Sequence, residues 1–85
     1  MTEIELSQEA FEEIVMSKDE TSRVEAPPNR LHSAGDVVII HEKSENNRSG
    51  RWMAAQIHCM DWEEDAKQIL VLSFNATHRE VEHST

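Results

Sequence analysis

The chain has 85 residues, of which 17 are acidic and eight basic, and its formal net charge is −9. This length predicts one domain, and the 38% hydrophobic content fits a folded chain rather than a disordered one. A field of this sign repels phosphate backbones at long range, which counts against non-specific binding of nucleic acids and is compatible with a basic protein partner.

Membrane and secretory segments are not expected. The chain contains no run of about 18 apolar residues, and Glu3 and Glu5 stand where a signal peptide would carry basic and then apolar residues. Cys59 is the only cysteine, so no internal disulfide can form, which fits a reducing compartment. We therefore predict a cytoplasmic protein in which Cys59 is a small buried hydrophobic side chain.

The beginning of the chain predicts a strand followed by a helix. Residues 2–6 alternate polar and apolar side chains, as in a strand with one buried face. Ser7 is then placed as a helix N-cap, with Glu9 in the first turn, where the helix dipole favours anions. The helix is expected to end near Ser17 or Lys18. Its apolar stripe consists of Ala10, Phe11, Ile14 and Val15.

The middle of the chain contains the most apolar window. Residues 21–25 predict a short strand, and residues 26–34 predict a loop in which Leu31 is a candidate core residue. Gly35-Asp36 then predicts a turn before the central strand, over residues 36–43. Because residues 37–40 are all β-branched, we expect this strand to be buried on both faces.

The second half of the chain predicts two more strands. Residues 44–50 have turn-forming side chains throughout and predict a long hairpin loop. Residues 51–60 alternate, with the odd-numbered face the drier one, and residues 68–74 predict the last buried strand after an acidic connection. The polar end of the chain, from residue 75, is expected to fray.

These elements predict an α+β fold. We expect a small mixed β-barrel of about five strands, with the last three in a meander and one main helix as a cap. Residues 1–76 would form the single domain, and residues 77–85 a polar C-terminal tail.

Three short motifs stand in a fixed order along the chain. They are Gly35-Asp36 before Val37–Ile40, Ser49-Gly50-Arg51 before a strand, and Val71-Leu72-Ser73-Phe74. Together they resemble the ASCH/PUA-like superfamily, in particular the small DUF3850-type domains of phage and bacterial genomes. The resemblance covers roughly residues 3–75. It implies a PUA-like barrel, a cleft between the helix, the second strand and the following loop, and binding of RNA or a modified nucleoside.

The resemblance also bears on catalysis. Some similar ASCH proteins are amidohydrolases of acetylated cytidine that use a lysine, a threonine and a glutamate. Thr21 matches that threonine, but Glu20 stands where the lysine is expected, and Arg23 and Glu25 occur in the reverse of the usual order. An ammonium group beside Thr21 would have to come from Lys18. We therefore predict a binding protein rather than an enzyme, and keep weak hydrolysis of acylated cytidine as a third hypothesis.

The first functional hypothesis is a binding module for RNA, a nucleotide or a modified nucleoside. Trp52 follows Arg51 and lies near Arg48, and base stacking requires an aromatic side chain on a basic surface. Core packing of Trp52 and an exposed ion pair between Arg23 and Glu25 are the alternatives. The candidate ligand-binding residues are Thr21, Arg23, Glu25, Arg48, Arg51 and Trp52.

The second hypothesis is an acidic accessory protein of phage type that binds and modulates a basic host protein in the host cytoplasm. A solvated helix face and solvated turn are the alternatives. We expect no cofactor and no metal, because the five histidines lack metal-ligand spacing. We also expect a monomer or a weak dimer. The candidate partner surface consists of Glu9, Glu12, Glu13, Asp61, Trp62, Glu63, Glu64 and Asp65.

Overall fold

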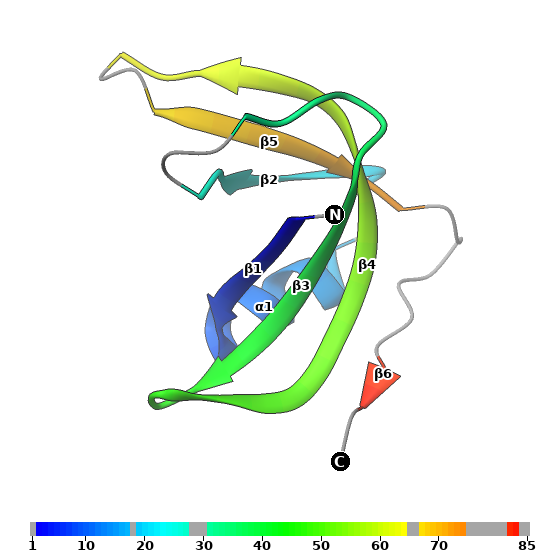
Figure 1. Cartoon of the computed structure of the whole chain (residues 1–85). Helices are drawn as coiled ribbons and strands as arrows, with labels where there is room; N and C mark the ends of the chain where they lie inside the picture. The colour runs from blue at the N-terminus through cyan, green and yellow to red at the C-terminus, as the bar shows by residue number, and fades with distance from the viewer. Residues whose placement is uncertain (1, 18, 28–30, 65–66, 75–81, 84–85) are drawn as a thin grey trace.

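The computed structural model of the chain describes residues 2–17, 19–27, 31–64, 67–74 and 82–83 (Figure 1). These residues contain one helix and six strands. They are β1 (Thr2–Ser7), α1 (Gln8–Met16), β2 (Thr21–Glu25), β3 (Val37–Ser44), β4 (Asn47–Trp62), β5 (Gln68–Ser73) and β6 (Glu82–His83).

The strands form one mixed sheet in the order β1-β3-β4-β5-β2. β1 is parallel to β3, whereas β3, β4 and β5 form the predicted antiparallel meander and β2 is antiparallel to β5. The α+β fold class is therefore confirmed. Within the described residues β1 and β2 are the two unpaired ends of this path, so the sheet is open and the closed barrel expected from the sequence is not seen.

β4 is the strand that both halves of the sheet share. Its first part, from Asn47 to Gln56, runs beside β3 and its last part, from Gln56 to Trp62, runs beside β5, with one irregularity in each pairing. Gln56 lies opposite both Val37 and Ser73. In Figure 1, β4 runs the full height of the molecule, with β1 and β3 beside its lower part and β5 and β2 beside its upper part. The short β6 pairs with Arg51 and Trp52 of β4, so part of the predicted frayed tail belongs to the sheet.

α1 covers one face of the sheet at β1 and β3 (Figure 1). As predicted, Ser7 caps the helix, its Oγ accepting a hydrogen bond from the Ala10 N–H at 3.2 Å, and Ser17 follows the last helical residue. Phe11 and Ile14 are buried, which places the predicted stripe in the core. The core consists of Ile4, Phe11, Ile14, Val24, Val38, Ile40, Met53, Ala55, Ile57, Leu70 and Leu72.

The prediction that β3 is buried on both faces is wrong. Val38 and Ile40 are fully buried beneath α1, but Val37 is 40% exposed and Ile39 only half-buried, because α1 packs on one face alone. The strand with four consecutive buried residues is β5, at Ile69–Leu72.

The hairpin between β3 and β4 is much tighter than predicted. Both strands extend into the segment expected to be a loop, and the turn consists of Glu45 and Asn46 alone. Glu45 has a φ of 57°, which glycine and asparagine adopt more readily than glutamate does.

Two side-chain predictions are also corrected. Cys59 is exposed, because β4 and β5 shift register between Ile57 and Cys59 and the burial alternation of β4 stops there. In the loop before β3, Leu31 is fully exposed and His32 is buried instead, its Nδ1 lying 3.4 Å from the Thr2 Oγ1. A polar contact, not an aliphatic side chain, therefore closes this end of β1.

Candidate functional site

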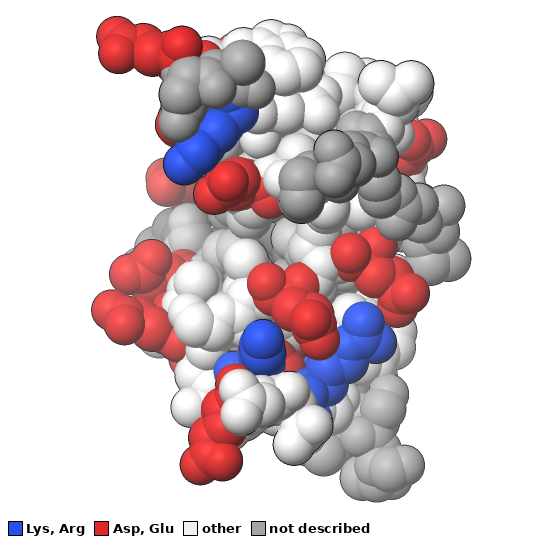
Figure 2. All heavy atoms as spheres, turned by 60° about the vertical axis from the view of Figure 1, so that its left-hand side comes forward, with Lys and Arg blue, Asp and Glu red and all other residues white. Residues whose placement is uncertain are grey.

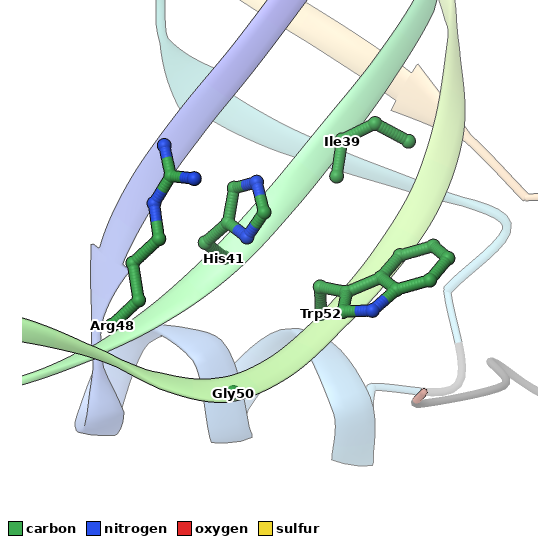
Figure 3. A pocket seen from close by; sticks show the side chains of 5 residues that line it. All are labelled: Ile39, His41, Arg48, Gly50 and Trp52. Carbon is green, nitrogen blue, oxygen red and sulfur yellow. The ribbon is translucent and has the colours of Figure 1, made fainter. Parts of the chain in front are cut away.

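The face of β3 and β4 that points away from α1 carries a pocket of about 430 Å³ (Figure 3). This volume lies within the range of small-molecule sites, roughly 300–1,000 Å³. His41 and Trp52 lie directly opposite each other in the β3–β4 register. The lining residues are Ile39, His41, Arg48, Gly50 and Trp52.

An irregularity in the pairing of β3 and β4 creates the hollow. His41 pairs with Trp52 and Lys43 with Arg48, so two residue steps of β3 correspond to four of β4. Gly50 lies in the extra length with a φ of 101°, a conformation that residues with a Cβ rarely adopt. Because Gly50 has no side chain, space remains between Arg48 on one side and Trp52 on the other (Figure 3).

Two carboxylates of β1 bind the polar side chains of the pocket. The His41 Nε2 lies 2.9 Å from the Glu3 Oε1, and the Arg48 Nε donates to the Glu5 Oε2 at 3.0 Å. The Arg48 guanidinium also lies 3.9 Å from Glu3. The hydrogen bond with His41 holds the pKa of Glu3 below its usual 4.5; desolvation opposes this effect and the charge of Arg48 adds to it. The pocket therefore has an aromatic side and a charge-compensated polar side.

Arg51, predicted to bind ligand, lies outside the pocket in a network that joins α1 to the sheet. Its guanidinium donates to Glu12 at 2.6 Å and to Glu42 at 3.0 Å, and lies 5.2 Å from the centre of the Phe11 ring. Glu42 is only 3% exposed and also accepts from the Ser49 hydroxyl at 2.7 Å. The hydrogen bond to Glu12 raises the pKa of Arg51 further above its ordinary value. Arg51 therefore connects α1 with β3 and does not line the pocket.

The remaining predicted ligand residues lie on β2, two strands beyond β4. Thr21, Arg23 and Glu25 are exposed, and Arg23 pairs across β5 with Asp61 at 2.7 Å rather than with Glu25. Both partners are more than half exposed, so the pair contributes less than about 1 kcal/mol. Lys18, the other catalytic candidate, lies outside the described residues. Of the six predicted ligand residues, Arg48 and Trp52 alone line the pocket, and hydrolysis remains a prediction from the sequence.

The predicted acidic partner surface is divided between two places. Glu9 and Glu13 are exposed on α1, and Glu63 and Glu64 follow the far end of β4, well separated from α1 in Figure 1. Trp62 beside them is 67% exposed. Two further members form ion pairs within the protein, Glu12 with Arg51 and Asp61 with Arg23. Asp65 lies outside the described residues.

The basic side chains form no continuous patch on the face that Figure 2 shows, where Lys and Arg lie beside Asp and Glu. Each of the three arginines in the described part of the chain pairs with a carboxylate. On that face, the described residues form no basic surface of the kind that binds a nucleic acid backbone without regard to sequence. Within the described residues, no group of His, Cys, Asp and Glu side chains is arranged to hold a metal ion, and α1 is too short to cross a bilayer.

Sequence reasoning missed Ile39 and His41 as pocket residues, and Glu3 and Glu5 as their neighbours. Alternation along β3 places Ile39 and His41 on one face, but the pairing with Trp52 depends on a register that only the structure shows. Comparison of the chain with protein-family models, curated proteins and solved structures gives no match. The pocket geometry and the sequence motifs are therefore the basis for a functional proposal.

Proposed function

We propose that the protein is a small binding module that takes a planar nucleobase in the pocket lined by Trp52, His41 and Arg48. The single observation that supports this proposal is the presence of an aromatic ring and two nitrogen-rich polar side chains around one hollow of suitable size. The ASCH/PUA-like resemblance agrees with it in ligand class, since it implies RNA or nucleoside ligands. It also implies a closed barrel, which the described residues do not form, and a cleft beside the helix, whereas this pocket lies on the face of the sheet away from α1.

Each lining residue has a role in such a site. The indole of Trp52 offers a surface for base stacking, which contributes about 1–3 kcal/mol per base in proteins that bind single strands. Ile39 supplies an apolar wall, and the nitrogens of His41 and Arg48 lie where hydrogen bonds to a base edge can form. Gly50 keeps the space between them open.

The two tryptophans allow a direct test, because the chain has no tyrosine. In a Trp62→Phe variant, Trp52 is the only strong fluorophore, and titration with the four ribonucleosides and with short single-stranded RNA at low salt should give a saturable change. The matched Trp52→Phe variant keeps Trp62, which lies at the far end of β4, and should show no change. The proposal fails if Trp52 responds to none of these ligands.

The exposed Trp62 supports a second candidate function, binding of a basic protein. An indole that is 67% exposed and flanked by exposed carboxylates has the composition of a protein-binding hot spot. Pull-down from cell lysate with wild type and with Trp62→Ala should then show a basic protein that the wild type alone retains. Equal recovery by both proteins would remove this candidate.

A further inference from the structure

We infer that the pocket selects uncharged nucleosides over their phosphorylated forms, and that Glu3 and Glu5 determine this selectivity. The inference rests on the proposed function, since it concerns the same pocket. It commits the ligand to one class, free nucleosides, and places nucleotides and nucleic acid strands outside it.

The first step concerns Arg48, the permanent cation of the lining. A phosphate group would bind this guanidinium, but its Nε already donates to Glu5 at 3.0 Å and its Nη1 lies 3.9 Å from Glu3. A phosphate would have to displace the Glu5 carboxylate and then remain beside both acids of β1. Repulsion between like charges at such distances is strong enough to weaken binding about tenfold.

The second step concerns His41, the other described lining residue that can carry a positive charge. Its Nε2 lies 2.9 Å from the Glu3 Oε1, and its side chain is only 14% exposed, so it is held against β1. The carboxylates of Glu3 and Glu5 therefore face His41 and Arg48, so each of these two lining side chains already has a carboxylate partner that a phosphate would have to displace. The net charge of the whole chain is also negative and repels phosphate from a longer distance.

The third step is that base recognition does not require a free cation. Stacking on Trp52 and contact with Ile39 depend on the flat apolar faces of the ligand, and hydrogen bonds to its edge can be made by groups that are already charge-compensated. The pocket thus offers the stacking surface and hydrogen-bonding groups that a nucleoside uses, while its carboxylates occupy the cation that a phosphate needs.

The experiment compares cytidine and adenosine with their 5′-monophosphates, by Trp52 fluorescence in the Trp62→Phe background at constant ionic strength. The unmodified pocket should bind each nucleoside about tenfold tighter than its monophosphate. Glu3→Gln combined with Glu5→Gln should abolish or reverse this preference by strengthening monophosphate binding. Asp19→Asn combined with Glu20→Gln also removes two negative charges, but from exposed positions outside the pocket, and should leave the preference in place.

The outcomes separate the two proposals. Monophosphate binding as tight as nucleoside binding in the unmodified pocket overturns the selectivity while leaving the base-binding pocket intact. An equal effect of both double substitutions assigns the preference to net charge and overturns the role of Glu3 and Glu5. If no variant binds any of the four compounds, the proposed function itself is wrong and the inference falls with it. Far-UV circular dichroism checks that each substituted protein folds. If the Glu3→Gln, Glu5→Gln variant does not fold, the single Glu5→Gln variant takes its place and should reduce the preference for nucleosides.

Discussion

Arg51→Met tests whether the network beneath α1 holds the helix on the sheet. Methionine keeps an unbranched apolar stem over Phe11 but removes both ion pairs of the guanidinium. Glu42, at 3% exposure, would keep the Ser49 hydroxyl as its described hydrogen-bond partner. Removing one partner of a buried ion pair costs about 3–5 kcal/mol. Because the Arg51 side chain is 32% exposed, water can take over part of its interaction with the carboxylates, and we expect the lower limit of this range, about 3 kcal/mol.

For a domain of this size, that loss corresponds to a fall in Tm of roughly 12–24 °C. Urea unfolding followed by far-UV circular dichroism measures the free energy directly. Arg48→Met is the matched control. It removes the same guanidinium group three residues along β4, but the ion pairs that it breaks are about half exposed, so it should cost less than about 1 kcal/mol.

A double variant completes the test. Adding Glu42→Gln to Arg51→Met removes the unpaired buried charge, so the double variant should be more stable than the sum of the two single losses predicts, by about 1 kcal/mol or more. Equal costs for Arg51→Met and Arg48→Met, or strict additivity with Glu42→Gln, would refute the view that Arg51 compensates the buried charge of Glu42.

Three further substitutions test local features of the fold. Ser7→Ala removes the oxygen that caps α1 and should destabilise the protein by about 1 kcal/mol in urea unfolding; an unchanged midpoint would show that the cap is dispensable. Glu45→Gly relieves the φ of 57° in the hairpin turn and should raise stability by about 0.5–1 kcal/mol, whereas a lower Tm would contradict this. Because the pKa of Glu3 lies below 4.5 in the folded state, its charge contributes stability above pH 4.5 that is lost as the pH falls through the folded pKa. The Tm difference between wild type and Glu3→Gln should therefore be constant from pH 5.5 to 5 and shrink towards pH 3; a difference independent of pH would refute the assignment.

Most elements of this fold could be predicted from the sequence because they follow from local periodicity and from capping or turn residues; β6 and the first residues of β4 could not. Alternation over residues 2–6 indicates β1, Ser7 marks the start of α1, and Gly35 marks the turn before β3. The alternation of β4 also carries information about the site, since Trp52 is even-numbered and Arg51 belongs to the drier, odd-numbered face. Parity along the strand is by itself enough to assign Arg51 and Trp52 to opposite faces.

What local patterns could not supply is pairing between distant segments. The parallel pairing of β1 with β3 brings Glu3 and Glu5 beside the pocket, and it joins residues more than 30 positions apart. Register shifts are equally hidden: one exposes Cys59, and the other makes room for the pocket at Gly50. Four β-branched residues at the start of β3 indicated a strand, but not that a single helix would leave one of its faces uncovered.

The double use of β4 has a consequence for how the chain can be cut or rearranged. In the described sheet, the strand order from β1 to β2 passes through β4, so neither half of the sheet retains a complete set of partners if the backbone is broken near Gln56. A break at Glu45–Asn46 leaves β4 whole and ends β3 where its pairing already stops. Circular permutants and complementing fragments should therefore be tolerated at that turn and fail at the midpoint of β4, which makes the molecule one folding unit despite its two-part shape.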